Sequence, residues 1–296
     1  MKELAILIVI FGSLLNIFYV LFYYMYPNIQ LAYSHINYIR KIILGDKISQ
    51  YITNHINKYI ICMAKWVSTN VNEYFDHQII YTETSEQKLL TTQAVKCLIP
   101  HGIIPFNGIS LYNLFQNDIF VVSDTLYEFP ISKYIVKQLN IMPCSKQNIK
   151  HILQNNKSVV IYPGGVREIF SSNELNEYHN IKKRIGLFKL ALELNKPLMP
   201  IYTFGLTQLY HRSKIELKIP YLFKNKTDTI AWYFGKYNTI YPIHTKFITV
   251  IGNYIIPTKQ DTIESIKQKY INEIQYIFHK YKHLHPLYLN KNIYFI

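Results

Sequence analysis

The sequence predicts an α/β protein whose mainly parallel sheet is flanked by helices and preceded by an N-terminal transmembrane helix. Short, almost entirely apolar runs recur along the chain, and stretches with helical periodicity separate them. Apolar runs of this kind are typical of parallel strands buried on both faces, and their alternation with helices is typical of βαβ units. A long uncharged stretch near the N-terminus predicts the membrane helix.

The strands and helices are expected where these patterns are clearest. The expected strands are the apolar runs 96–99, 118–123, 158–162, 197–203 and 245–255. The expected helices between and after them are 131–140, 146–156, 180–195 and 260–283. We divide the chain into an anchor (1–27), a helical N-terminal region (28–92) and the α/β domain (93–296).

The anchor is residues 4–25, which contain no charged side chain. A helix rises about 1.5 Å per residue, so this stretch spans a hydrocarbon core of about 30 Å. A cleaved signal peptide is the alternative, but its apolar region is only about 7–15 residues long. The basic residues that follow the stretch place the rest of the chain in the cytosol: Arg40, Lys41 and Lys47.

The composition also favours a membrane surface. Of 296 residues, 49% are hydrophobic and only 17% are charged, yet the net charge is +14. A protein that is both apolar and basic suits an anionic membrane, whereas a nucleic-acid partner, which we do not expect, requires the charge alone. The cysteines are too few and too widely spaced for a disulfide framework or a zinc site, and the histidines near the C-terminus lack a carboxylate partner, so we expect no metal.

His101 is the first candidate for chemistry. It follows the strand expected at 96–99 and precedes Gly102, which lets a substrate approach the backbone. Open α/β sheets place their ligands at the carboxyl ends of the strands. A histidine there can take a proton from a hydroxyl near neutral pH. The alternative is a loop histidine without a role.

The second candidate is the turn after the strand expected at 158–162, Pro163 to Glu168. Gly164 and Gly165 leave two backbone N–H groups free to face an anion or a developing oxyanion. Arg167 adds a bidentate donor, and the Glu168 carboxylate can accept hydrogen bonds from hydroxyls. The alternative is a tight strand-to-helix turn with a surface ion pair.

The third candidate is the basic start of the next helix, with Arg184 and Lys189. These residues provide a counter-charge for a phosphorylated cofactor or for lipid head groups. The alternative is a solvated basic face.

Together these segments resemble the glycerolipid acyltransferase superfamily, and most closely the branch of diacylglycerol acyltransferase type 2, phytyl ester synthase and transmembrane protein 68. That branch has an HG pair followed by a proline, then PGGxxE, then a basic-Gly-aromatic helix start. The corresponding residues here are His101-Gly102 with Pro105, Pro163 to Glu168, and Arg184-x-Gly186. Order and spacing agree from about residue 95 to residue 285.

The resemblance implies transfer of a fatty acyl group from acyl-CoA, a co-substrate rather than a bound cofactor, to a hydroxyl of mono- or diacylglycerol or of a long-chain alcohol. His101 would be the general base. The turn is PGGVRE rather than the PEGTR-like turn of phosphate-acceptor enzymes, which favours a neutral acceptor. The residues expected to bind substrate are Gly102, Pro163, Gly164, Gly165, Arg167, Glu168, Arg184 and Lys189. The family also implies membrane lipids as partners and the endoplasmic reticulum as location.

The sequence departs from the superfamily beside the proposed base. The superfamily has an Asp five positions after the His, but position 106 here is Phe. Asn107 or Asp124 is the expected substitute that orients the imidazole. Two alternatives stay open: a lysophospholipid acyltransferase, and a non-catalytic lipid-binding protein with the same fold.

Overall fold

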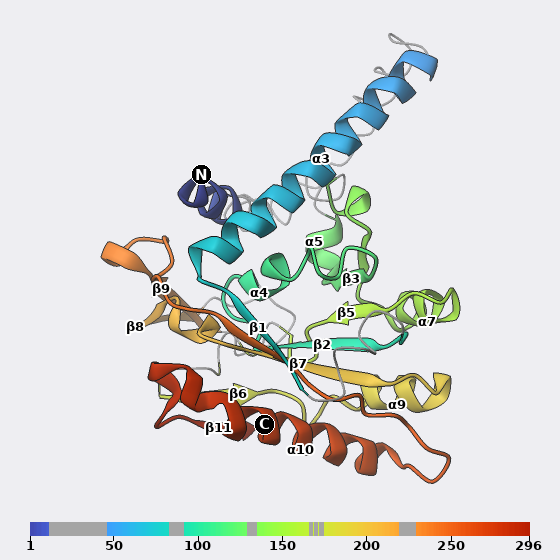
Figure 1. Cartoon of the computed structure of the whole chain (residues 1–296), viewed down its shortest axis with the longest axis vertical. Helices are drawn as coiled ribbons and strands as arrows, with labels where there is room; N and C mark the ends of the chain where they lie inside the picture. The colour runs from blue at the N-terminus through green and yellow to red at the C-terminus, as the bar shows by residue number, and fades with distance from the viewer. Residues whose placement is uncertain are drawn as a thin grey trace.

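The fold is that of a computed structural model, which describes residues 1–11, 46–82, 92–128, 135–165, 168, 171, 175–218 and 229–296. A seven-stranded sheet forms its centre, in the order β1-β10-β7-β2-β5-β3-β4 (Figure 1). Only the β10–β7 pairing is antiparallel among the pairings of this sheet. The expected mainly parallel sheet is therefore confirmed. Its strands are β1 (Gln78–Tyr81), β2 (Val95–Ile99), β3 (Ile119–Val122), β4 (Ile141–Pro143), β5 (Val159–Ile161), β7 (Leu198–Phe204) and β10 (Ile248–Ile251).

Helices cover both faces of the sheet. The α-helices are α3 (Asp46–Tyr74), α4 (Phe106–Ser110), α5 (Asp124–Glu128), α7 (Lys146–Gln154), α9 (Ile185–Leu194) and α10 (Ile263–Tyr281). Side chains of α7, α9 and α10 pack on one face, and residues 106–117 pack on the other. The long helix α3 contacts α4 and projects from the rest of the molecule (Figure 1). The 3-10 helices are η1 (Leu206–Gln208), η2 (Lys236–Asn238), η3 (Lys282–Leu284) and η4 (Pro286–Tyr288).

Two small sheets complete the fold. The last strand, β11 (Asn292–Phe295), pairs in parallel with β6 (Asn176–His179). An antiparallel hairpin is formed by β8 (His211–Lys218) and β9 (Thr229–Phe234). None of these four strands was predicted: β6 and β8 are largely polar, and the short apolar runs in β9 and β11 were not singled out.

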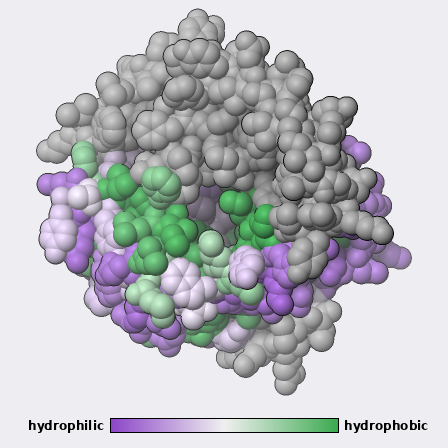
Figure 2. All heavy atoms as spheres, turned by 90° about the horizontal axis from the view of Figure 1, so that it is seen from above, coloured by the Kyte–Doolittle hydropathy of each residue, from purple (hydrophilic) through white to green (hydrophobic). Residues whose placement is uncertain are grey.

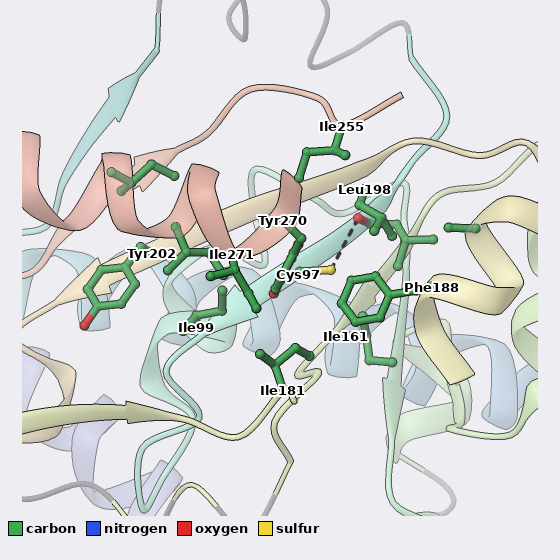
Figure 3. Close-up of a cluster of buried hydrophobic side chains, with 14 of the residues drawn as sticks. Cys97, Ile99, Ile161, Ile181, Phe188, Leu198, Tyr202, Ile255, Tyr270 and Ile271 are labelled. Carbon is green, nitrogen blue, oxygen red and sulfur yellow. Dashed lines mark hydrogen bonds between the residues drawn. The ribbon is translucent and has the colours of Figure 1, made fainter. Parts of the chain in front are cut away.

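The packing explains why the central strand is apolar throughout. Side chains of β2 alternate between the faces, so that Cys97 packs toward α9 and α10 while Leu98 packs toward residues 106–117. Both side chains are fully buried. Figure 3 shows Cys97 of β2 between Tyr270 of α10 and Phe188 of α9. A strand buried on both faces has no solvated side that would require polar residues.

The expected membrane anchor lies partly outside the described residues. Residues 2–11 form a helix, and the remainder of the 4–25 stretch is not described. Ile6 and Ile10 are buried in the same apolar cluster as Val67 and Val71 of α3. Within the described ranges, no helix has the length and the apolar character needed to cross a membrane. The single-pass anchor is therefore not confirmed.

The N-terminal region contains an element that the sequence analysis missed. Helix α3 agrees with the helical expectation for residues 28–92, but β1 is a strand and pairs with β10 at the edge of the central sheet. Of the helix expected over 131–140, residues 135–138 are helical, and residues 131–134 lie outside the described part. The division into domains stays a prediction.

Candidate active site

The candidate site lies where β2 and β5 end. These strands pair in parallel, so their carboxyl ends meet at one edge of the sheet. His101 comes two residues after β2, and the turn of Pro163, Gly164 and Gly165 begins two residues after β5. The structure therefore brings the first two predicted segments together.

A backbone carbonyl orients the His101 imidazole. Its Nδ1 lies 2.7 Å from the carbonyl oxygen of Gly102. Because a carbonyl oxygen only accepts hydrogen bonds, Nδ1 carries the proton, and the neutral ring has its lone pair on Nε2. Burial lowers the pKa of His101, and the Gly102 carbonyl and the Glu168 charge oppose this only in part. The ring is thus a neutral base at neutral pH.

Gly102 cannot be replaced without strain. Its φ is +67°, in the left-handed region that favours glycine. A Cβ at this position would lie 2.9 Å from Cγ of Leu206. The glycine therefore allows the chain to turn sharply after His101 and present its carbonyl to the ring.

Glu168 lies beneath His101 and is 1% exposed. Its Oε2 accepts a hydrogen bond from the backbone N–H of His101 at 2.9 Å, and its Oε1 accepts from the N–H of Asn180 at 3.2 Å and from Nδ1 of His179. Burial alone would raise the pKa of Glu168, but His179 and the hydrogen bonds to the carboxylate hold it below the usual value. Both oxygens of Glu168 already have protein partners. The expected contact between Glu168 and substrate stays a prediction.

The glycine turn fits closely around this carboxylate. A Cβ on Gly164 would lie 1.7 Å from Oε1 of Glu168, so only glycine fits there. Gly165 has φ +63°. Nη2 of Arg184, the residue before α9, donates to the Gly164 carbonyl at 3.2 Å. Arg184 therefore joins the site, whereas Lys189 is an exposed residue of α9.

One predicted substrate-binding residue cannot be placed. Arg167 lies outside the described residues. The buried Pro163 begins the turn before Gly164.

Asn107 does not bond the imidazole, which corrects one expected role. It is fully buried in α4, and its Nδ2 donates to the Pro100 carbonyl at 3.1 Å. Its Oδ1 accepts from the Tyr162 hydroxyl at 2.7 Å. The Tyr162 ring in turn lies 4.8 Å from the His101 ring, centre to centre. Asn107 therefore acts on His101 only through Tyr162 and the backbone.

Asp124 is exposed in the first turn of α5. Burial raises the pKa of the Cys144 thiol, and the charge of Asp124 nearby adds to this effect. The hydrogen bond of Nδ1 already goes to Gly102. The structure thus places Asp124 beside Cys144 and gives it no contact with the His101 ring within the described part of the chain.

Two residues of the site were not singled out from the sequence. Tyr162 stands directly before the glycine turn, a position that could have identified it. His179 belongs to the polar strand β6, five residues before Arg184, and no motif includes it. Across the described ranges, no cluster of three histidine, cysteine or acidic side chains could hold a metal ion.

The fold and the site define a class of protein: an α/β protein with an uncharged histidine and a glycine turn at the carboxyl edge of a parallel sheet. The family model described as diacylglycerol acyltransferase matches residues 18–295. The chain belongs to this family, as the resemblance found in the sequence implied.

Relatives with curated names agree with this membership. Diacylglycerol O-acyltransferase 2 of Dictyostelium discoideum is 27% identical over 213 residues, covering 62% of this chain and 64% of the relative. The Homo sapiens protein of the same name is 28% identical over 183 residues, covering 56% and 43%. The chain thus spans less than two thirds of the length of the curated relatives it matches.

A solved structure is also similar to this chain. It is the crystal structure of the 1-acyl-sn-glycerophosphate (LPA) acyltransferase PlsC from Thermotoga maritima, with 14% identity and a TM-score of 0.48 over 93% of this chain and 95% of that one. The α/β class follows from the mainly parallel pairing of the central strands and from the helices that cover the sheet.

Proposed function

We propose that this protein is a membrane-associated acyltransferase that moves a fatty acyl group from acyl-CoA to the hydroxyl of a neutral lipid, with diacylglycerol as the first candidate acceptor. Membership of the diacylglycerol acyltransferase family supports the reaction class. The observation that carries the proposal is the His101 imidazole, whose Nδ1 is held by the Gly102 carbonyl and whose Nε2 is left as the base.

The proposed reaction is a direct transfer. Nε2 of His101 takes the hydroxyl proton of the acceptor while the hydroxyl oxygen forms a bond to the thioester carbon. The carbon–sulfur bond then breaks, and the coenzyme A thiolate leaves and takes the proton from the imidazolium. The products are an ester and free coenzyme A, and His101 returns to its neutral form.

Backbone N–H groups are the proposed donors to the oxyanion. The N–H of His101 already donates to Glu168, and the N–H of Gly165 donates to the Tyr162 carbonyl at 3.2 Å. We therefore assign the N–H groups of Gly102 and Gly164 to the oxyanion. Donors held in place before the reaction stabilise developing charge without reorganisation.

Basic residues near the turn are the proposed partners of the coenzyme A phosphates. Arg184 lies against Gly164, and Lys189 is exposed on α9, the helix that begins directly after Arg184. Arginine suits this role because its planar guanidinium forms paired hydrogen bonds with phosphate oxygens. Arg167 keeps its expected role toward the acceptor as a prediction.

Exposed apolar residues support membrane association. Figure 2 shows apolar side chains gathered on the face seen from above, the end of the molecule from which α3 projects. The net charge of +14 favours an anionic surface. A single N-terminal anchor over residues 4–25, a cytosolic catalytic domain and the endoplasmic reticulum remain part of this proposal. Large apolar side chains that are more than half exposed near the N-terminus and on α3 are Met1, Leu4, Leu7, Phe11, Tyr59 and Met63.

An acyl-transfer assay tests the proposal. Membranes that contain the full chain receive labelled oleoyl-CoA with monoacylglycerol, diacylglycerol, a long-chain alcohol or lysophosphatidate. We expect ester formation with a neutral acceptor, and we expect His101→Gln to abolish it. His283→Gln is the matched control, because His283 is an exposed residue of η3.

Three other outcomes would each contradict one part of the proposal: the acceptor, the base or the reaction itself. Preference for lysophosphatidate would favour a lysophospholipid acyltransferase. Ester formation that survives His101→Gln would contradict the role of His101 as base. A wild-type protein that acylates none of the four acceptors would favour the non-catalytic lipid-binding alternative.

A further inference from the structure

A chain of buried polar groups connects helix α10 to the backbone of His101. The Tyr270 hydroxyl lies 3.4 Å from Nε2 of His179, Nδ1 of His179 bonds Oε1 of Glu168, and Oε2 of Glu168 accepts the N–H of His101. Tyr270 is fully buried, and His179 and Glu168 are each 1% exposed. Figure 3 shows Tyr270 extending from α10 into the buried cluster on this face of the sheet.

We infer that His179 is a positioning residue for the proposed acyl transfer, because it holds the Glu168 carboxylate that fixes the main chain of His101. The inference rests on the proposed function. His179 does not touch the reacting atoms; it acts through Glu168, whose second oxygen bonds the His101 N–H at 2.9 Å.

The Glu168 carboxylate is buried and depends on its hydrogen-bond donors. An ionised carboxylate in a protein interior requires paired donors, because it has lost its water. Oε1 of Glu168 receives only a backbone N–H, that of Asn180, besides His179. His179 is thus the one side-chain donor to Glu168 among the described residues. Without it, burial dominates and raises the pKa of Glu168.

Glu168 is connected to the proposed base through the backbone N–H of His101. Protonation would remove the charge of the carboxylate and weaken its oxygens as acceptors from Asn180 and His101. The His101 N–H would then be held less firmly, and the segment that ends in the Gly102 carbonyl would be freer to shift. That carbonyl orients Nδ1, so a shift of the backbone changes the direction of Nε2. Misplacement of a reacting group by about 1 Å can cost about a hundredfold in rate.

His179 is held in place by the last strand of the chain, β11. It is the last residue of β6, opposite Phe295 in the parallel pairing with β11. Its carbonyl accepts from the N–H of Ile296 at 2.9 Å, and the two rings of His179 and Phe295 lie 6.0 Å apart. The final strand of the chain therefore places the side chain that supports the site.

Other titratable groups also face the Glu168 carboxylate. They are His101, which follows β2, Tyr202 of β7 and Tyr270 of α10. Burial raises the pKa values of both tyrosines well above the ordinary value, and the charge of Glu168 contributes, so both stay neutral and neither supplies a counter-charge. His179 is itself titratable, so a change in the acid region of the rate profile reports the His179–Glu168 pair together with His101.

The test compares His179→Leu with His179→Asn. Leucine removes the donor, whereas the asparagine amide places an N–H near the position of Nδ1. His285→Leu is the matched control, since His285 is also buried, at 2% exposed, and bonds the Lys246 carbonyl rather than Glu168. For each variant, kcat and KM for acyl-CoA are measured against pH at equal amounts of folded protein, and the Tm is recorded.

We expect His179→Leu to lower kcat by about tenfold or more, with little change in KM. Its acid limb should move to higher pH, because the pKa of Glu168 rises when its donor is removed. His179→Asn should restore most of kcat and return the limb toward its wild-type position. His285→Leu should lower the Tm without moving the limb.

The outcomes separate this inference from the proposed function. A wild type that requires His101, together with a His179→Leu variant of unchanged kcat and pH profile, overturns the positioning role alone. A His179→Asn variant as defective as His179→Leu at normal Tm also overturns it. A wild type without any acyl transfer overturns both.

Discussion

At the scale of single residues, the orientation of His101 depends on a backbone group. The superfamily pattern places an Asp near the base, whereas here the carbonyl of Gly102 bonds Nδ1. A carbonyl selects the tautomer but carries no full charge, so it stabilises the imidazolium less than a carboxylate would. The His101 imidazole is therefore less basic than one paired with Asp, and it stays neutral over a wider range of pH.

This arrangement predicts the pH dependence of the reaction. Only the neutral imidazole accepts a proton, and burial lowers the pKa of His101 from its ordinary value of 6.5. Activity should therefore rise with pH through a midpoint below 6.5 and be constant between about pH 7 and 8. A rate profile of kcat/KM measures the midpoint, and a value above 6.5 would contradict the environment described for the ring.

The glycine turn predicts a second result. Gly164→Ala places a methyl group 1.7 Å from Oε1 of Glu168, so the turn or the carboxylate must move. We expect a lower Tm and loss of most acyl transfer. Gly186→Ala is the control for stability, since a Cβ there meets nothing within 4 Å. Its Tm should stay equal or rise, because alanine stabilises a helix by about 0.5–1 kcal/mol relative to glycine. Equal Tm values for the two variants would argue against the close fit of the turn.

At the scale of elements, α10 covers the sheet face below the site and supplies Tyr270. One side of this helix is apolar, and its side chains are buried against β2 and β7. Its start is closed by a capping box in which the Thr262 hydroxyl accepts from the N–H of Ser265 at 3.1 Å and the Ser265 hydroxyl accepts from the N–H of Thr262 at 2.9 Å. These bonds satisfy backbone donors that the helix itself cannot.

Loss of this cap predicts a measurable change in stability. Thr262→Ala should lower the free energy of unfolding by about 1 kcal/mol. Urea unfolding of the detergent-solubilised protein, followed by circular dichroism, measures the change. Lys58→Ala in the exposed middle of α3 is the control, and we expect it to remain within about 0.5 kcal/mol of the wild type. A Thr262 variant no different from this control would show that the cap contributes nothing.

At the scale of the whole molecule, the core contains ion pairs as well as apolar side chains. Lys96 of the central strand is 4% exposed, and its Nζ lies 2.6 Å from Oδ2 of Asp118. Burial lowers the pKa of Lys96, and the charge of Asp118 opposes this. The sheet holds this ammonium group at its centre because the Asp118 carboxylate reaches it from the residue before β3 and because it lies over the Phe115 ring, 4.4 Å from the ring centre.

Removing one partner of this pair predicts a large loss of stability. Asp118→Asn leaves the Lys96 charge buried and unpaired, and we expect unfolding to become easier by about 3 kcal/mol. The double variant with Lys96→Met should recover much of this loss in the same urea experiment. Glu193→Gln, which breaks an exposed pair with Lys150, should change little. An Asp118 variant as stable as the Glu193 variant would contradict the burial of the charge.

Much of the fold was predictable from local pattern. The strands β3, β5 and β10 lie within the predicted apolar runs, and β2 and β7 extend beyond theirs by one residue each. The helices α7, α9 and α10 lie within predicted helices. The strands β6 and β11 were missed, because NEYH is polar, the apolar part of NIYF is only three residues long, and the two strands pair with each other. The same holds for His179, whose partners come from other parts of the chain.

The sequence by itself determined the α/β class, the family, and the meeting of His101 with the glycine turn, because apolar periodicity is local and parallel strand ends share one edge. Only the tertiary structure decided which groups support the base. His101 and Glu168 are 67 residues apart in the chain, and His179 and Tyr270 are 91 apart. Contacts over such separations leave no periodicity in the sequence, and the partner of Nδ1 is a backbone carbonyl, which every residue possesses.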